Sequence, residues 1–369
     1  MAPAMAVDQV VDDDDTDCPN ATATTIQQGV NQASAGDTVT VCAGEYAEQV
    51  EIATSAKDGL RLRSQEPLEA TITYPATVTS PETLVHIDEA DDVTVRGFEI
   101  TGPYVGSGGF HSGVFVDNSL RAIIRGNAIT QIREMQDSGA QDGFGVVVGR
   151  NFLESFSTAL VAGNLISDYQ KGGVLVDGAS ATTEDNSRSL VAANFIQADE
   201  TLQDNLAPNG VQVSRGADGG VVRNAISENQ FSGNPDAGTG SGIILFQPGQ
   251  VLARENLVAQ NDNNIFLLDT DEARIDGNVV RDAIVFDGIF ADEDSRDNVI
   301  ADNSIRDSAE HDCHDDSVGG GSGGSANTWT GNDGETQNRS GLCLGAAVTE
   351  PIFVPPTSTS EAPEASRIR

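Results

Sequence analysis

The densest group of residues whose side chains could do chemistry lies near the carboxyl end of the chain. Two histidines stand there among aspartates, in the order His311, Asp312, His314, Asp315 and Asp316. Two imidazoles and three carboxylates could bind a metal ion or transfer protons. The same residues are also typical of an acidic capping loop with histidines at turn positions. We favour the capping loop, because the group follows the repeated part of the chain, and we predict no metal centre.

Two further groups of carboxylates could hold Ca²⁺ or Na⁺ at turns. The first contains Asp269, Asp271 and Glu272, and the second spans residues 292–297. Neither group has the spacing of an EF-hand loop, and solvated turns are the simpler interpretation. The sequence therefore predicts no cofactor, with Ca²⁺ at these turns as the alternative.

A repeated phrase shows which elements must position these residues. A Gly, once an Asn, precedes three mostly apolar residues at seven places, and an Asn between apolar residues follows each time. The shortest period, from Gly242 to Asn264, is 22 residues. A fixed period with insertions of variable length predicts a solenoid whose units bury their apolar sides on one another. The phrases begin at Gly113, Gly145, Gly173, Gly210, Gly242, Asn264 and Gly288, and the asparagines are Asn127, Asn164, Asn194, Asn224, Asn256, Asn278 and Asn303.

The repeats are too short for pairs of helices, and their apolar runs of three or four residues predict strands. Strands that return at this period must be parallel and wound as a coil. We expect the asparagines to form a column at one turn of the coil, with each amide bonded to the next.

The phrases Gly113-Val-Phe-Val and Gly126-Asn-Ala-Ile resemble the repeats of the right-handed parallel β-helix proteins of the pectate-lyase-like superfamily. The resemblance covers about residues 20–345. It implies an all-β fold, a single right-handed parallel β-helix solenoid with an N-terminal capping helix and a disulfide-closed C-terminal cap. That fold serves lyases, hydrolases, epimerases, tailspikes and adhesins, so it does not specify a function.

Both ends of the solenoid carry capping signals. Residues 24–33 predict a short amphipathic helix with Ile26 and Val30 on its buried face. Four cysteines form two local pairs, which favours disulfides in an oxidising compartment over reduced or metal-bound thiols. The resemblance implies the pairs Cys18 with Cys42 and Cys313 with Cys343.

These signals divide the chain into five segments. We expect an acidic flexible arm at residues 1–17, an N-terminal cap at 18–36, the parallel β-helix at 37–309, a C-terminal cap at 310–345, and a tail or linker at 346–369.

Insertions in consecutive coils predict a binding rim along one flank, because long loops on a rigid scaffold commonly bind ligands. Neutral drift of surface loops is the alternative. The resemblance implies that a lyase or epimerase of this fold needs a Lys or Arg base and a group that neutralises a uronate. Lys171, Arg133 and Asp142 are the catalytic candidates. The expected substrate-binding residues are His111, Arg133, Asp142, Phe152, Tyr169, Lys171, Asp204 and Asn209.

A second surface follows from strand alternation. If Val114 and Val116 point inward, Phe115 and its equivalents point outward. Exposed apolar residues in a row indicate a covering partner, here an identical chain in a trimer, or else the chain's own loops or tail. The expected interface residues are Phe115, Val147, Leu175, Ile244, Phe266 and Phe290.

Charge limits the partners. The chain has 57 acidic and 20 basic residues, for a net charge of −37, and only Lys57 and Lys171 are lysines. Such a surface disfavours nucleic acid and anionic membranes, and it resembles that of halophilic proteins in dense salt. An ordinary acidic secreted protein is the alternative. No segment has the length of a membrane-spanning helix.

We therefore expect an extracellular or virion-surface recognition and scaffold protein in a high-salt environment, which binds cell-surface or extracellular glycans at its loop rim. The alternative is a carbohydrate-active enzyme, a uronate polysaccharide lyase or epimerase.

Overall fold

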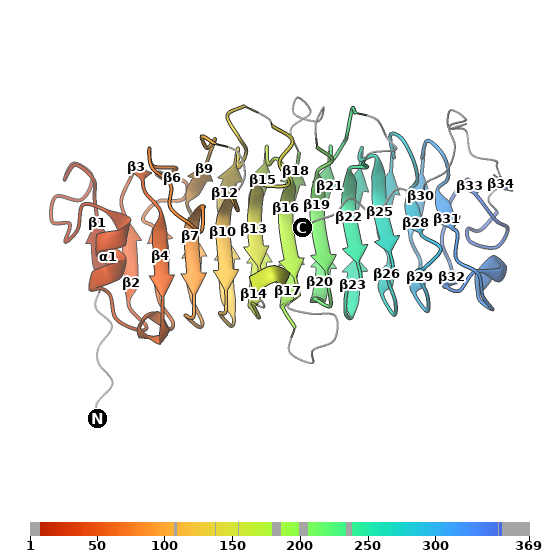
Figure 1. Ribbon diagram of the computed structural model, residues 1–369, viewed down its shortest axis with the longest axis horizontal. Helices are drawn as coiled ribbons and strands as arrows, with labels where there is room; N and C mark the ends of the chain where they lie inside the picture. Colours follow the sequence, from red (N-terminus) through yellow and green to blue (C-terminus); the bar gives the residue numbers. More distant parts are fainter. Residues whose placement is uncertain are drawn as a thin grey trace.

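The computed structural model describes residues 8–106, 109–136, 138–153, 155–178, 186–198, 206–233, 238–345 and 347–348. Strands wind along one long axis into three parallel sheets, named here A, B and C (Figure 1). Each full coil contributes one strand to sheet C, then one to sheet A and one to sheet B, as β10, β11 and β12 do. The chain is a right-handed parallel β-helix, as its repeats predict.

The strands are short and in register from coil to coil. Sheet A contains β1 Gln9–Val11, β2 Thr38–Val41, β5 Arg61–Ser64, β8 Thr94–Arg96, β11 Ala122–Arg125, β14 Thr158–Ala162, β17 Arg188–Ala192, β20 Asp218–Val222, β23 Val251–Arg254, β26 Arg274–Asp276, β29 Val299–Ala301 and β32 Thr328–Thr330. Sheet B contains β3 Gly44–Ala47, β6 Ala70–Thr73, β9 Glu99–Thr101, β12 Ala128–Thr130, β15 Leu165–Ser167, β18 Phe195–Gln197, β21 Ala225–Ser227, β24 Leu257–Ala259, β27 Val279–Arg281 and β30 Ser304–Arg306. Sheet C contains β4 Val50–Ala53, β7 Thr83–Asp88, β10 Ser112–Asp117, β13 Phe144–Val148, β16 Gly172–Asp177, β19 Asn209–Ser214, β22 Ser241–Phe246, β25 Asn263–Leu268, β28 Ile289–Ala291, β31 Cys313–Asp315, β33 Thr336–Gln337 and β34 Ala347–Val348.

The repeated glycine is required by close packing inside the coil. Gly113 and Gly145 begin the inward side of β10 and β13, opposite sheet B. A Cβ on Gly145 would lie 2.6 Å from Ile166 Cγ2 and 2.6 Å from the carbonyl oxygen of Gly173. A larger residue would therefore separate the two sheets. Val114 and Val116 point inward and are fully buried, as expected.

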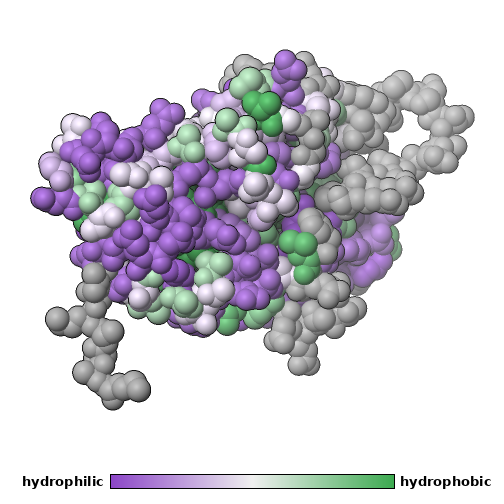
Figure 2. All heavy atoms as spheres, turned by 60° about the vertical axis from the view of Figure 1, so that its left-hand side comes forward, coloured by the Kyte–Doolittle hydropathy of each residue, from purple (hydrophilic) through white to green (hydrophobic). Residues whose placement is uncertain are grey.

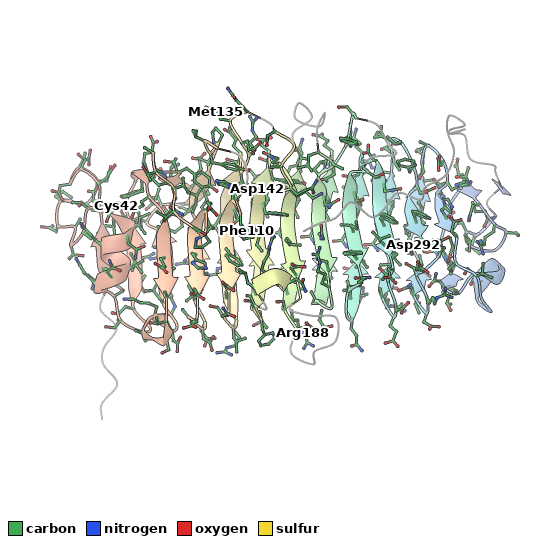
Figure 3. All side chains as sticks on the ribbon, viewed as in Figure 1. Cys42, Phe110, Met135, Asp142, Arg188 and Asp292 are labelled. Atoms are coloured by element: carbon green, nitrogen blue, oxygen red, sulfur yellow. A yellow bond between two sulfur atoms is a disulfide. The ribbon has the colours of Figure 1, made fainter. Side chains whose placement is uncertain are left out.

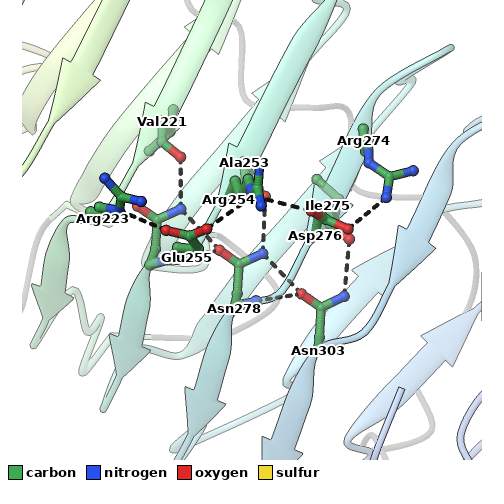
Figure 4. A network of polar contacts seen from close by, with 11 residues as sticks. Val221, Arg223, Ala253, Arg254, Glu255, Arg274, Ile275, Asp276, Asn278 and Asn303 are labelled. Atoms are coloured by element: carbon green, nitrogen blue, oxygen red, sulfur yellow. Dashed lines mark hydrogen bonds and ion pairs between the residues drawn. The ribbon is translucent and has the colours of Figure 1, made fainter. Parts of the chain in front are cut away.

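The asparagine column is confirmed. The amide of Asn278 donates to Asn303 Oδ1 at 2.9 Å, and the same oxygen accepts from the backbone N–H of Asn278 at 2.9 Å (Figure 4). Each side chain thus satisfies buried polar groups at the corner between sheets A and B. The column continues into the C-terminal cap, where Asn303 donates to Asn332 at 2.8 Å. Outside it, Arg223, Glu255, Arg254, Asp276 and Arg274 form a band of ion pairs.

The N-terminal cap begins earlier than the sequence predicts. Helix α1, Ile26–Gln32, buries Ile26 and Val30 over the open end of the coil, and the Thr25 side chain accepts from the N–H of Gln28. However, β1 lies within residues 1–17, the segment expected to be a flexible arm, and pairs in parallel with β2. Val11 is fully buried, and its burial supplies the apolar contact that orders the strand. Residues 1–7 are outside the described part.

Disulfides close both ends. Cys18 is bonded to Cys42, and Cys313 to Cys343, as the resemblance implied. In the described ranges, the remaining helical turns are the 3₁₀ segments η1 Ser55–Lys57, η2 Asn151–Leu153 and η4 Ser322–Gly324. None of the helices in the described ranges has the length and apolar character needed to cross a bilayer. The predicted tail lies outside those ranges, except for β34.

Candidate functional site

The centre of the expected rim is a buried histidine–aspartate pair. His111 immediately precedes β10, and Asp142 stands two residues before the neighbouring strand β13. The Nδ1 atom of His111 lies 2.6 Å from Asp142 Oδ2, and the His111 backbone N–H donates to Asp142 Oδ1 at 2.6 Å. The ring of Tyr104 stacks on His111 at 3.6 Å. Burial, with the charge of Asp142 beside it, raises the pKa of Tyr104. These contacts hold two loops together, and both members of the pair are withdrawn from solvent.

Lys171 is directed towards a different loop. Its Nζ donates to the carbonyl of Ala207 at 2.8 Å, ahead of β19. Burial lowers the pKa of Lys171 to about 8. A lysine in this state has the basicity of a general base. Arg133 is half-buried in the loop before Asp142, and its carbonyl accepts from the N–H of Tyr104. Met135 of the same loop projects away from the coils (Figure 3).

Other expected rim residues lie elsewhere. Tyr169 is part of the buried core and donates its hydroxyl to Asn229 at 2.6 Å, because the loop turns inward after β15. Asn209 is buried in β19 and donates to Gln212. Tyr169 and Asn209 therefore do not form a solvent-facing rim. Asp204 and the side chain of Phe152 lie outside what the structure describes.

The outward row on sheet C is covered in its N-terminal part. Phe115, Val147 and Leu175 are 0–3% exposed and pack with Phe110 and Phe144. The guanidinium of Arg150 lies 3.9 Å above the Phe110 ring, and burial lowers the pKa of Arg150 to about 10. The expectation that these three residues form an exposed stripe is wrong, because the chain's own loops cover them, which was the stated alternative. Phe110 is labelled near Asp142 in Figure 3.

The row is open in its C-terminal part. Ile244, Phe266 and Phe290 are half-buried, and strand register places them in line with His314. The rings of Phe266 and Phe290 stack with centroids 5.0 Å apart, and Phe290 lies 4.6 Å from His314. We call Ile244, Phe266 and Phe290 the outer column.

The outer column ends at a group of four residues that we call the C-terminal cluster, Asp287, Glu310, His311 and His314. One ligand atom from each lies within 4.8 Å of the others. The Nδ1 atom of His314 lies 2.9 Å from Asp287 Oδ2 and its Nε2 3.0 Å from Asp316 Oδ1. The Nδ1 atom of His311 lies 3.3 Å from Asp287 Oδ1.

Asp287 and the histidines stabilise one another's charges. Burial opposes a charged Asp287, but hydrogen bonds from His311 and His314 outweigh it and lower the pKa of this carboxyl. Burial likewise opposes a charged His314, but its bonds to Asp287 and Asp316 raise the pKa of His314 to about 10. At neutral pH this is an ion-pair network with both nitrogens of His314 engaged.

The sequence-defined group at residues 311–316 therefore splits. Asp312 accepts from the N–H groups of Glu335 and Thr336, and Asp315 accepts from the indole of Trp329 at 2.7 Å. These two carboxylates organise the cap. Sequence reasoning missed Asp287, which precedes Gly288 one coil earlier. In the structure, the register of Ile289 with Cys313 places Asp287 beside the two histidines.

The carboxylates considered for Ca²⁺ form turn hydrogen bonds. Asp292 accepts from the backbone N–H of Asp269 and from Ser295, while Asp271 accepts from the N–H of Arg296. Burial raises the pKa of Asp292. Each bond is of the kind expected for a polar turn.

Similar solved structures share the fold. An alginate lyase from Paenibacillus sp. str. FPU-7 is 14% identical, with a TM-score of 0.55 over 75% of this chain and 91% of that one. XylC in complex with xylose is 12% identical, with a TM-score of 0.57 over 82% and 69%. The A-module of the Azotobacter vinelandii mannuronan C-5 epimerase AlgE6 is 13% identical, with a TM-score of 0.55 over 85% and 88%. No curated protein matches the sequence.

One family model matches the sequence itself, over residues 142–332. The match begins at the loop-bearing middle coils and includes the whole C-terminal cluster. It spans more than half of the chain, which therefore belongs to the family described as periplasmic copper-binding protein (NosD).

Proposed function

We propose that this chain is an extracytoplasmic binding protein that holds a carbohydrate chain against the outer column. The observation that carries the proposal is the stack of Phe266 on Phe290, half-exposed and continuous with His314. Binding sites for small polar ligands combine aromatic surface with a few polar groups that fix orientation. Here the polar groups are the carboxylates of Glu310 and Asp316, which lie beside His314.

Two comparisons support a carbohydrate ligand and an extracytoplasmic site. The similar structures include an alginate lyase, a mannuronan epimerase and a complex with xylose. The family is described as periplasmic. Two disulfides fit an oxidising compartment, which includes the periplasm and the cell or virion surface. The fold supplies the flat parallel sheet, and the outer column supplies the apolar contact.

Charge restricts the ligand. Hydrophilic residues dominate the described surface around the N-terminal end, and hydrophobic ones gather there only in small groups (Figure 2). With a net charge of −37, the protein repels a polyanion unless salt screens the charges. We propose a neutral glycan, or a uronate polymer in concentrated salt.

If the protein is adapted to such salt, its thermal unfolding midpoint rises between 0.1 and 2 M NaCl, and a falling midpoint would contradict this.

The test is a glycan array at 2 M NaCl, followed by titration calorimetry with the best oligosaccharide. Phe266→Ala with Phe290→Ala is expected to weaken binding at least tenfold. Val279→Ala is the matched control, because Val279 is an exposed apolar residue of sheet B, 48% accessible. Binding unchanged in the double variant, or no hit on the array, would refute the proposal.

A second copy of the chain is the competing occupant of the same surface. We expect it only if light scattering shows an oligomer, such as a trimer, that Phe290→Ala dissociates. A strict monomer would leave the surface to a ligand. Phe115, Val147 and Leu175 are excluded from such an interface by their burial.

The enzymatic alternative uses Lys171 as a base, with Arg133 and Asp142 as the other catalytic candidates. The pKa of Lys171, near 8, favours it. Incubation with alginate or pectate at high salt, followed by absorbance of the unsaturated product, tests a lyase. A signal that Lys171→Ala abolishes would replace binding by catalysis as the function.

The C-terminal cluster favours a second candidate function, copper binding, because imidazoles are suitable ligands for Cu(II). The donor types fit, and His311, His314, Asp287 and Glu310 would hold the ion. Binding must first displace the proton shared within the network. The chain has one tryptophan, and Trp329 contacts Asp315 of the same cap. Quenching of Trp329 fluorescence at one equivalent of Cu(II), lost in His311→Gln, is expected. Equal quenching in that variant would exclude the cluster.

A further inference from the structure

A second group of histidine and acid side chains lies on the outer face of sheet C, far towards the N-terminal end. His86 and Asp88 alternate along β7 and therefore point to the same face. Asp117, the last residue of β10, is the register partner of Asp88, and Phe115 is the partner of His86. One ligand atom from each of His86, Asp88 and Asp117 lies within 4.8 Å of the others. We call these three residues the N-terminal cluster.

Two atoms of the N-terminal cluster are buried without a hydrogen-bond partner. They are Nε2 of His86 and Oδ1 of Asp117, in residues that are 9% and 8% exposed. The nearest approach between these side chains, His86 Nε2 to Asp117 Oδ2, is 3.9 Å, which is too long for a hydrogen bond. Within the described ranges, no lysine or arginine forms an ion pair with Asp88 or Asp117. Buried polar groups are rarely left in this state.

The separation matches two ligands of one ion. Nitrogen and carboxylate oxygen atoms that each lie about 2.1 Å from the same metal are at most about 4.2 Å apart. The imidazole is already oriented, because its ring stacks on Phe115 with centroids 5.2 Å apart and planes 15° apart. Phe115 itself is fixed in the covered part of the outward row. Asp88 is half-exposed, which leaves an entry path from solvent.

We propose that His86, Asp88 and Asp117 bind a divalent transition-metal ion, with Nε2 of His86 and one oxygen of each carboxylate as ligands. One imidazole and two carboxylates favour an ion of borderline character such as Zn²⁺ over Ca²⁺ or Mg²⁺, which prefer oxygen alone. Two negative charges neutralise the ion, and its remaining positions are open to water or an external donor. The site lies outside residues 142–332, so the family match does not imply it.

The first experiment is calorimetric titration of the full, EDTA-treated chain with Zn²⁺ at pH 7. Both His86→Gln and Asp117→Asn are expected to bind Zn²⁺ at one site at least tenfold more weakly than the wild type does. Glu45→Gln, which removes an exposed carboxylate of β3, is the matched control and is expected to bind as the wild type does. Wild-type affinity in His86→Gln and Asp117→Asn would overturn the proposal. So would the absence of any Zn²⁺ binding to the wild type below 1 mM, a Kd that corresponds to a binding free energy of about −4 kcal/mol.

A second measurement separates this site from the C-terminal cluster. The chain contains four histidines, so its imidazole NMR signals are few enough to assign by single substitution. The signal missing in His86→Gln is expected to shift with the first equivalent of Zn²⁺. A shift confined to the signals of His311 and His314 would overturn the proposal and assign the ion to the other cluster. The outcome is independent of the glycan experiment, because neither readout uses the outer column.

Discussion

The N-terminal and C-terminal clusters use the same residue types on the same sheet, but they differ in how well their hydrogen bonds are satisfied. At the C-terminal cluster, His314 bonds through both ring nitrogens, and the two carboxylate oxygens of Asp287 pair with His311 and His314. At the N-terminal cluster, His86 Nε2 and Asp117 Oδ1 have no hydrogen-bond partner. A histidine among carboxylates thus forms an ion-pair network in one place and leaves buried polar atoms without hydrogen bonds in the other. Composition alone does not separate the two cases.

The largest expected effect is the loss of Asp287. Asp287→Asn leaves His311 and His314 buried without their shared counter-charge, and removing one partner of a buried ion pair costs about 3–5 kcal/mol. Urea unfolding followed by Trp329 fluorescence measures the cap directly. A change below about 1 kcal/mol would show that the C-terminal cluster is no more satisfied than the N-terminal one.

The next effect is a pH dependence of the C-terminal cap. Because the pKa of His314 is raised from 6.5 to about 10, the folding stability that its charged form contributes is fully present below pH 6.5 and is lost as the pH rises towards 10. The lowered pKa of Asp287 adds stability that is lost only as the pH falls below its usual value. The difference in unfolding free energy between wild type and His314→Gln is expected to shrink by roughly 2–4 kcal/mol between pH 6 and 10. A constant difference would contradict the ion pair.

A third comparison concerns the two parts of the outward row. Phe115→Ala removes a buried ring and is expected to cost about 3 kcal/mol, whereas Phe290→Ala removes a half-exposed ring and is expected to cost about 1 kcal/mol. Thermal and urea unfolding of the two variants test this order. Equal costs would mean that the outer column is covered in solution, as a self-associating surface would be.

The smallest effect belongs to the N-terminal cluster without metal. Asp117→Asn is expected to change the unfolding free energy by less than about 1 kcal/mol, since the lost carboxylate made no bond at Oδ1. With Zn²⁺ present, the wild type is expected to gain stability that the variant does not gain. A large metal-independent loss in Asp117→Asn would make this cluster structural as well.

The sequence predicts the fold well because a short period leaves few choices. The glycines, the asparagine column, the inward Val114 and Val116, and the covering helix α1 all follow from it. Local spacing does not predict what loops do after they leave the coil. Phe115 is covered by Phe110, over which Arg150 lies, and Tyr169 turns inward to Asn229.

Both clusters also depend on register between coils. Asp117 stands 31 residues after His86 in the chain, and Asp287 stands 24 residues before His311, yet each lies beside its histidine. Only the alignment of strands, which the sequence indicates less directly than the period, brings these side chains together.

The asparagine column gives the coils from Asn127 to Asn303 the same junction. The side-chain oxygen of each asparagine accepts from the coil before it, and its amide N–H donates to the asparagine of the coil after it. Asn256 and Asn278 show that 22 residues suffice for one complete coil. Duplication or deletion of one whole coil in the gene would leave the asparagine bonds between the remaining coils matched, so this fold can change its length without a change in its core.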